Sequence, residues 1–335
     1  MRLLVLGGTV FLSRTVALCA RDQGHDVTCV ARGVSGEPPD GVRFVRIDRA
    51  APDALAPLAG EQFDGVVDVA RQSVTQVRAA VRALGARAAH WTYVSSRSVY
   101  AEKATAGHDA TAQLVDAADG SLDEDYPTNY GNLKVAAERC VLDALGEKAF
   151  ICRPGLVVGA GDVSDRYGYW PARMARGGEV LCPGDPSKHV QWVDVVDLAA
   201  WIVLAAEQRL VGVYDATCPP TPMGELLTRT AAGCETSPQF TWVGNEFLLG
   251  RGVEPWMGPR SLPLWLPEAE YAGYASWDVS RSLASGLRIR PIEQTATDAL
   301  VWERRLGLDR PRQAGLTAGE ETSLLHEWRA VGGAR

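Results

Sequence analysis

Short apolar runs alternate with amphipathic segments over the first half of the chain. Arg2–Leu6 is an apolar run of strand length, and the segment Phe11–Asp22 after it repeats apolar residues at helical spacing. The same alternation continues to residue 153. The further expected strands are Asp26–Val30, Arg43–Ile47, Phe63–Val69, His90–Ser95 and Ala149–Arg153, and the further expected helices are Thr75–Leu84 and Asn129–Leu145. This order predicts an α/β fold, a doubly wound parallel sheet with helices on both faces.

The pattern loosens after Gly155. A Trp- and Pro-rich stretch covers Pro255–Pro267, and Thr221 is expected to cap a helix that has Pro222 at its first position. The remaining expected elements are a helix over Asp194–Glu207, a strand over Val211–Ala216 and closing helices near 278–285, 292–305 and 318–330, the last with a capping box from Thr317 to Glu320. We expect a smaller C-terminal α/β domain for the substrate. The predicted boundaries are 1–155 for the nucleotide-binding domain, with 190–217 contributing to it, and 156–335 for a mainly substrate-binding domain.

Composition narrows the class of protein. The 335 residues carry a net charge of -7 without a basic tract, which argues against nucleic acid as the main partner. No apolar run approaches the ~20 residues of a membrane span, and the interrupted apolar stretch near the N-terminus does not fit a signal peptide. Seven cysteines without a CxxC pair indicate reduced thiols in the cytoplasm, and five scattered histidines predict no metal site.

The first turn, "LVLGGTVFLSR", is typical of a dinucleotide site. Gly7 and Gly8 allow a tight turn between strand and helix, and backbone N–H groups at the helix start attract phosphate. The usual fingerprint has two further glycines where this chain has Val10 and Ser13. Ser13 is small enough for close packing, and its hydroxyl is a candidate phosphate ligand. The alternative is that the two glycines only turn the chain. In its sequence context, the turn predicts a Rossmann-type nucleotide site.

The end of the second strand bears on the choice of cofactor. Sites that prefer NAD usually place a carboxylate there, whereas this chain has Arg32. A guanidinium can hold a 2′-phosphate through charge-assisted hydrogen bonds. We therefore expect NADP ahead of NAD, with an exposed arginine as the alternative. Asp48, after the third strand, could accept from the adenine amino group or cap its own loop.

The strongest chemical signal is "YGNLK", in which Tyr130 and Lys134 share one helix face. An ammonium beside a phenol stabilises the phenolate, so this tyrosine could exchange a proton with a substrate while hydride moves to or from a nicotinamide. Upstream, "WTYVSSRSVY" ends the fifth strand at the sheet edge where ligands bind. Ser96 is placed there to hydrogen-bond the reacting oxygen, although a serine at a strand end usually serves the turn.

These motifs together resemble the extended short-chain dehydrogenase/reductase family, in its NAD-dependent epimerase/dehydratase branch. "GGTVFLS", "VSSRSVY", "YPTNYGNLK" and "CRPGLVVGAGD" each resemble a segment of that branch, and the resemblance covers roughly residues 1 to 310. It implies Ser96, Tyr130 and Lys134 as the catalytic triad. The implied cofactor-binding residues are Gly7, Gly8, Thr9, Val10, Phe11, Leu12, Arg32, Asp48, Arg49, Val69, Ala70, Tyr130, Lys134, Arg153, Pro154 and Gly155.

The substrate side is less clearly marked. The ~25-residue loop before the catalytic helix has a length typical of lids. Aromatic walls with a few polar groups describe a small-molecule pocket, although single tryptophans are more often core residues. The expected substrate residues are Asp165, Arg166, Tyr169, Trp170, Gln191 and Trp192. The sequence shows no clear cluster of basic residues that could clamp a diphosphate, which disfavours a nucleotide-sugar substrate.

We therefore expect an NAD(P)-dependent oxidoreductase that transfers hydride at a carbonyl or secondary alcohol of a small molecule. One alternative is a nucleotide-sugar epimerase or dehydratase that retains NAD. A second, from another class, is a nucleotide-sensing or RNA-binding relative without turnover, which the intact tyrosine and lysine disfavour. The sequence does not determine the substrate, the direction of the reaction or whether the chain forms a homodimer.

Overall fold

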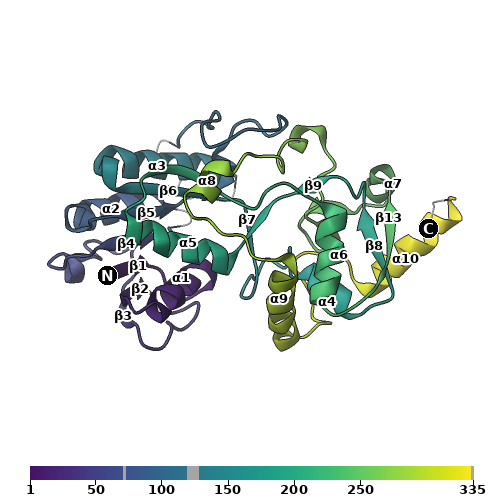
Figure 1. Cartoon of the computed structure of the whole chain (residues 1–335), viewed down its shortest axis with the longest axis horizontal. Coiled ribbons are helices and arrows are strands. Elements are labelled where there is room, and N and C mark those ends of the chain that lie inside the picture. The colour runs from purple at the N-terminus through teal and green to yellow at the C-terminus, as the bar shows by residue number, and fades with distance from the viewer. Residues whose placement is uncertain (71–72, 119–127, 333–335) are drawn as a thin grey trace.

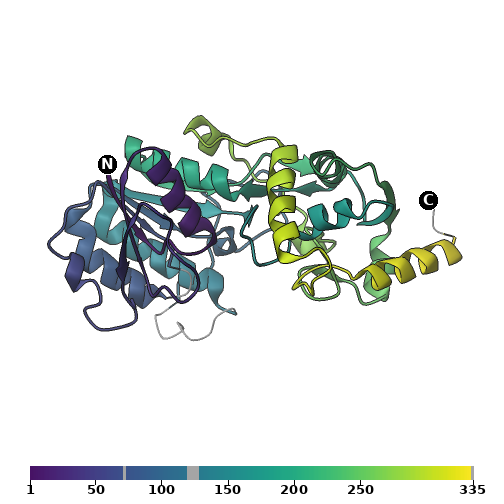
Figure 2. The same cartoon turned by 90° about the horizontal axis from the view of Figure 1, so that it is seen from below.

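The structure is a computed structural model that describes residues 1–70, 73–118 and 128–332. Figure 1 shows two lobes along the long axis, with the N-terminal elements in one lobe and most of the chain after residue 158 in the other. The last helix lies at the far end of the second lobe, and a view from below shows the same division (Figure 2).

The first lobe is built on a seven-stranded parallel sheet in the order β11-β6-β5-β4-β1-β2-β3. Its strands are β1 (Arg2–Leu6), β2 (Asp26–Ala31), β3 (Arg43–Arg46), β4 (Gly65–Asp68), β5 (Trp91–Val94), β6 (Ala149–Pro154) and β11 (Gly212–Ala216). Its helices are α1 (Phe11–Asp22), α2 (Val74–Leu84), α3 (Tyr130–Leu145) and α5 (Val195–Gln208). Strand order reverses between β1 and β4, the point at which doubly wound sheets bind ligands. The predicted fold class is confirmed.

Two apolar cores hold the helices to the sheet. Leu3 and Val5 face one side with α1 and α5, whereas Leu4 and Leu6 face the other with α2 and α3. Side chains alternate between the faces of a strand, so a strand buried on both sides reads as a continuous apolar run. The expected strands all occur, with ends shifted by up to two residues.

The second lobe has a core of its own, in which Trp170, Leu226 and Leu300 are fully or almost fully buried. Its strands are β7 (Leu156–Val158), β8 (Glu179–Pro183), β9 (His189–Val190), β10 (Trp192–Asp194), β12 (Thr221–Pro222), β13 (Gln239–Val243), β14 (Glu254–Trp256) and β15 (Ser261–Pro263). Its helices are α4 (Tyr169–Ala175), α6 (Met223–Gly233), α7 (Asn245–Gly250), α9 (Ile292–Leu306) and α10 (Ala318–Ala330), whereas α8 (Ser280–Ala284) packs on β11 of the first lobe. Short 3-10 turns complete the chain at Ala56–Leu58, Gly85–Arg87, Arg97–Val99, Gly146–Lys148 and Ala269–Tyr271.

The start of α6 differs from the prediction. Pro222 is the N-cap rather than the first helical residue, and Thr221 donates its hydroxyl to the carbonyl of Pro219. The two residues pair with β9 as a short antiparallel strand instead. Thr221 therefore lies one residue before the N-cap with its hydroxyl bonded to Pro219, and it does not cap the helix. The capping box of α10, in contrast, forms as predicted between Thr317 and Glu320.

Within the described residues, no helix combines the length and the apolar character needed to span a bilayer. All seven cysteines are free thiols, and five of them are buried.

Candidate active site

The turn after β1 has no room for side chains at Gly7 and Gly8. Gly7 and Gly8 have φ values of +142° and +103°, a region that side chains disfavour. A Cβ on Gly8 would lie 2.4 Å from the sulfur of Cys29, and one on Gly7 would lie 2.8 Å from Val69. The turn therefore brings bare backbone against β2 and β4, which is the close approach that a pyrophosphate cradle requires.

The first turn of α1 is open to an anion. Val10 is the N-cap and offers no side-chain acceptor, and the first turn holds no acidic residue. The first N–H groups of a helix lack partners within the helix, and the helix dipole is positive at that end. The Ser13 hydroxyl donates to the carbonyl of Val10 at 2.9 Å. A pyrophosphate thus fits the backbone of residues 7–13, and Ser13 already has a local hydrogen bond.

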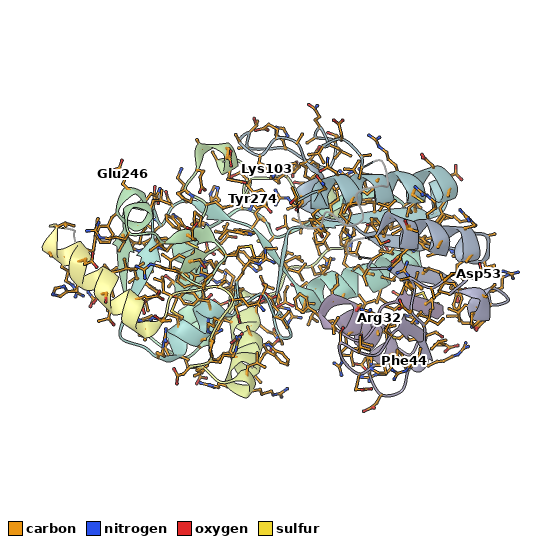
Figure 3. All side chains as sticks on the ribbon, turned by 180° about the vertical axis from the view of Figure 1, so that it is seen from behind. Arg32, Phe44, Asp53, Lys103, Glu246 and Tyr274 are labelled. Atoms are coloured by element: carbon orange, nitrogen blue, oxygen red, sulfur yellow. The ribbon has the colours of Figure 1, made fainter. Side chains whose placement is uncertain are left out.

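Two arginines mark the far end of the nucleotide site. Arg32 follows β2 and is exposed, near Phe44 in Figure 3. Arg46, at the end of β3, donates to the carbonyl of Arg32 at 3.0 Å and lies against Gly33. No local sequence signal points to Arg46, because only the pairing of β2 with β3 brings its guanidinium beside Arg32. This end of the site is positively charged.

Two residues expected at the cofactor have local partners instead. Asp48 accepts from the backbone of Ala50 at 3.0 Å, the loop-capping alternative. Arg49 pairs with the fully buried Asp68 through bonds of 2.8 and 2.9 Å and also donates to the carbonyl of Gln76. The structure thus corrects the expectation for the Arg49 side chain: it neutralises a buried carboxylate. Val69 and Ala70 follow β4 at the carboxyl edge of the sheet.

The Ser96 turn lies directly against the start of α3. The Ser96 hydroxyl accepts from the backbone N–H of Ser98 and donates to its hydroxyl, both at 3.1 Å. A Cβ on Gly131 would lie 2.3 Å from the Ser98 carbonyl oxygen. The glycine of "YGNLK" thus lets the helix start touch the turn. It places Tyr130, the residue before it, beside the segment that carries Ser96.

Lys134 is held beneath Tyr130. Its ammonium donates to the carbonyls of Ala70 and Val94, both at 2.8 Å, and lies 5.8 Å from the centre of the Tyr130 ring. The same ammonium lies 4.8 Å from the ring of Tyr93. The lysine is 3 % exposed. Carbonyls from two neighbouring strand ends therefore fix a buried positive charge close to a phenol at the carboxyl edge of the sheet.

A buried polar network supports this edge from behind. Ser95 donates to Glu138, which pairs with Arg153 through bonds of 2.9 and 2.6 Å. Arg153 also donates to the Tyr100 hydroxyl, and Tyr100 donates to Asp215 at 2.7 Å. The Arg153 side chain thus has a structural role, whereas Pro154 and Gly155 continue its backbone along the sheet edge. Burial raises the pKa of Asp215 to about 6, although Tyr100 and nearby arginines lower it.

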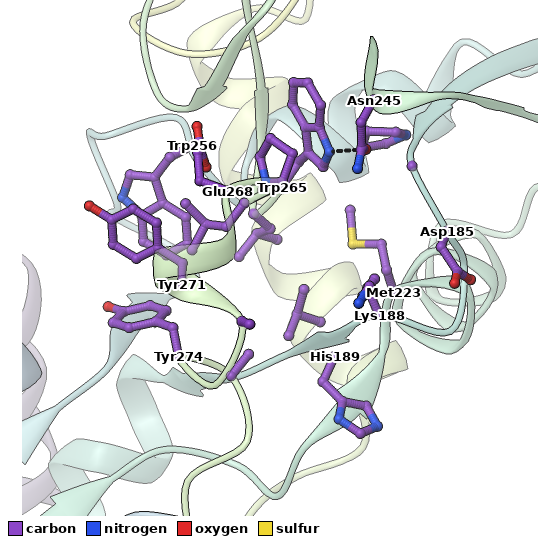
Figure 4. Close-up of a pocket in the computed structure, with 18 of the residues that line it drawn as sticks. Asp185, Lys188, His189, Met223, Asn245, Trp256, Trp265, Glu268, Tyr271 and Tyr274 are labelled. Carbon is purple, nitrogen blue, oxygen red and sulfur yellow. Dashed lines mark hydrogen bonds between the residues drawn. The ribbon is translucent and has the colours of Figure 1, made fainter. Parts of the chain in front are cut away.

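Two neighbouring hollows lie beyond Ser98. The smaller, about 350 Å³, is lined by Ser98, Lys103 and residues of the 255–274 region; we name it the proximal pocket. The larger, about 510 Å³, lies in the second lobe between the 183–191 loop and residues 264–276; we name it the distal pocket (Figure 4). The residues that line both are Trp256, Leu266, Glu268, Tyr271 and Tyr274.

Most expected substrate residues have structural roles. Tyr169 and Trp170 are buried in the second core, where the Trp170 indole donates to the carbonyl of Pro263 at 3.1 Å. Asp165 is buried in ion pairs with Arg310 and Arg312. These side chains are corrections to the expected pocket, because folding places them between elements that the sequence does not show to be neighbours.

The other three expected substrate residues lie nearer the pockets. Gln191 lines the distal pocket, but its side-chain amide is already hydrogen-bonded. It donates to the backbone carbonyls of Cys218 and Trp277 and accepts from the backbone N–H of Trp277. Trp192 packs in the second core. The guanidinium of Arg166 lies over the Trp256 ring at 5.5 Å. The sequence signal that could have found the pocket is the Trp- and Pro-rich stretch, which contains Trp256. Residues 119–127 of the expected lid lie outside the described residues.

The model of the NAD dependent epimerase/dehydratase family matches residues 71–215. The matched segment covers less than half of the chain and includes the YGNLK helix. A curated relative, 2'-dehydrokanamycin reductase of Streptomyces kanamyceticus, is 29% identical over 332 residues, which cover 92% of this chain and 86% of the relative. Together these matches indicate an NAD-dependent enzyme that is similar to proteins of the epimerase/dehydratase family.

Solved structures of the family share the fold. UDP-glucuronic acid 4-epimerase from Bacillus cereus, in complex with NAD, aligns with a TM-score of 0.63 at 14% identity and covers 91% of this chain and 99% of that one. UDP-glucose-4-epimerase from Stenotrophomonas maltophila, with bound NAD and formylated UDP-arabinopyranose, aligns with a TM-score of 0.65 at 17% identity over 91% and 98% of the two chains.

Proposed function

We propose that this chain is a reductase that uses NADPH to convert a ketone of a small molecule to a secondary alcohol. The observation that carries the proposal is the buried Lys134 ammonium beneath Tyr130, next to the Ser96 turn. The name of the reductase relative, which aligns over most of both chains, supports reduction ahead of epimerisation.

Each residue of the triad has a distinct task. The hydroxyl of Tyr130 gives its proton to the carbonyl oxygen of the ketone. The charge of Lys134 stabilises the phenolate that remains. The Ser96 hydroxyl donates to the same carbonyl oxygen and orients it. When bound, the reduced nicotinamide supplies the hydride that the carbonyl carbon receives. The product is an alcohol, and the phenolate regains its proton from solvent.

The cofactor-binding backbone fits this chemistry. The backbone of residues 7–13 would hold the pyrophosphate, and residues at the carboxyl ends of β4, β5 and β6 would hold the nicotinamide. Arg32 and Arg46 supply the positive charge for a 2′-phosphate, which supports NADPH over NADH. Known neighbours bind NAD, so this preference distinguishes the chain from them.

The proposal is tested by NADPH consumption with a panel of ketones and UDP-sugars. We expect net consumption with a ketone and a fall of ~10²–10⁴-fold in kcat for Tyr130→Phe, which keeps the ring and removes the proton donor. Lys134→Met should reduce both kcat and cofactor affinity. Conversion of a UDP-sugar without net consumption would indicate an epimerase instead. Wild-type turnover in Tyr130→Phe would exclude the proposed triad.

A further inference from the structure

The wall between the two pockets includes an aromatic ring, Tyr274, that is held by contacts with the Ser96 turn. Arg97, the residue after Ser96, is buried and lies between the rings of Tyr274 and Trp277, at 4.9 and 4.7 Å from their centres. It also donates to the Tyr274 carbonyl at 2.6 Å. The residue after Ser96 is therefore packed against Tyr274, which lines both pockets.

The dimensions of the pockets exceed what a small ketone needs. Ser98, which bonds to Ser96, lines the proximal pocket, and the distal pocket continues from the shared wall into the second lobe. Their volumes of about 350 and 510 Å³ fall in the range of sites for drug-sized ligands. A molecule whose ketone reaches Ser96 can thus place a second ring beyond Trp256 and Tyr271.

The distal pocket offers ring faces and few charges. Trp256, Trp265 and Tyr271 contribute its aromatic surface, as Figure 4 shows, and the Trp265 indole is tied to Asn245 at 2.9 Å. Rings of this kind pack against the apolar faces of other flat or saturated rings, whereas a few polar groups orient them. The surface is suited to a stack of rings with hydroxyl groups at their edges.

The charges in the pockets do not form a diphosphate clamp. In the distal pocket, the carboxylates Asp185 and Glu268 accompany one lysine, Lys188, which is exposed. The proximal pocket combines Glu268 with Lys103, whose ammonium lies over the Tyr271 ring at 5.5 Å. Binding a diphosphate requires several converging cations or N–H groups, and here acidic groups oppose the cations within the same pockets.

Resting on the reductase function above, we propose that the substrate is a glycoside of two or more rings that carries a ketone on one ring and no phosphate. The ketone ring occupies the proximal pocket beside Ser96 and Tyr130. The remaining ring stacks on Trp256 and Tyr271 in the distal pocket.

Three probes test this assignment: a disaccharide with one ring ketone, the matching keto-monosaccharide and UDP-glucose. We expect Trp256→Ala and Tyr271→Ala each to raise the KM for the keto-disaccharide by about tenfold with kcat within twofold, because stacking is lost away from the reacting atoms. The KM for the keto-monosaccharide should rise by a smaller factor, because that ring meets Trp256 and Tyr271 only from the proximal pocket. Trp302→Ala, on α9 outside both pockets, is the matched control for loss of a tryptophan.

Calorimetric binding of the reduced disaccharide in the presence of NADP⁺ gives a readout that does not need turnover. Weaker binding to Trp256→Ala supports the assignment even if no ketone is reduced, in which case the reductase function alone fails. Reduction of the keto-monosaccharide without binding of the disaccharide overturns the assignment and leaves the reductase function intact. Tight competition by UDP-glucose that is lost in Lys103→Met or Lys188→Ala also overturns it.

Discussion

Ser13 stands where the usual dinucleotide turn has its last glycine. Its hydroxyl bonds to the Val10 carbonyl, and its Cβ lies 3.0 Å from the position a Cβ on Gly7 would take. The side chain therefore fills the space under the turn and has a local acceptor. This geometry favours the backbone as the source of most phosphate binding.

We predict that Ser13→Ala leaves the affinity for NADPH within about twofold of wild type. Ser13→Gly should likewise keep the affinity for NADPH within about twofold of wild type. It should lower the free energy of unfolding by up to ~1 kcal/mol, because glycine is a poor helix former. Calorimetric titration and thermal unfolding measure the two effects separately. A loss of ~1.5–3 kcal/mol of binding free energy in both variants would instead assign the hydroxyl to the phosphate.

Arg32 and Arg46 form the second test at the residue scale. If both guanidiniums meet the 2′-phosphate, each alanine variant should lose affinity for NADPH by about 10-fold or more, the worth of a charge-assisted hydrogen bond, and affinity for NADH should change little. Arg82→Ala, an exposed arginine in the last turn of α2, controls for the change in net charge. An unchanged ratio of the two affinities would contradict the assignment.

At the scale of elements, the contact between α3 and the Ser96 turn decides the site geometry. The Cβ of Gly131→Ala would meet the Ser98 carbonyl at 2.3 Å, and backbone atoms cannot yield as a flexible side chain can. We predict that this variant lowers kcat by more than tenfold, since a displaced helix start moves Tyr130 away from the productive geometry.

Gly319→Ala on α10 is the matched control, because a Cβ there meets nothing within 4 Å. It should keep wild-type kcat, with stability equal to or slightly above wild type because alanine is a better helix former than glycine. Steady-state kinetics together with circular dichroism distinguish a shifted helix from an unfolded chain. Full activity in Gly131→Ala would mean that the close contact does not position Tyr130.

At the scale of the whole molecule, Asp215 couples folding to pH. It lies at the end of β11, 2 % exposed, where it accepts from Tyr100 and faces Arg97 and Arg153. Burial raises its pKa from 3.8 to about 6. Between these values the folded chain keeps a proton that the unfolded chain has released, so this group's contribution to stability falls as pH rises.

We predict that Asp215→Asn removes this dependence. The free energy of unfolding of the variant minus that of wild type should increase by up to about 3 kcal/mol from pH 4 to pH 7, as the pKa shift implies. Urea unfolding at a series of pH values measures it. A difference that stays constant over this range would show that Asp215 has an ordinary pKa in the folded chain.

The alternation of apolar runs and amphipathic segments was sufficient to predict the sheet and its helices, because a parallel strand buried on both faces leaves a local mark in the sequence. The motif "YGNLK" is local in the same way, because the two residues of the proposed triad that it contains lie four positions apart on one helix. Thr221 shows the limit of such reasoning. The local sequence predicts a helix cap at Thr221, but the structure pairs this residue with residues 189–190 in a short strand. No residue near Thr221 in the sequence indicates that pairing.

The sequence by itself determined the fold class, the glycine turn and the spacing of Tyr130 and Lys134, since each depends on residues within a few positions of one another. Only the tertiary structure decided which aromatic residues line the pockets and which are core. Trp170 and Trp256 look alike in the sequence, but one lies in the second core and the other beside Ser98. The reason is that burial of a side chain depends on contacts between segments more than a hundred residues apart, and these contacts form only when the two lobes fold.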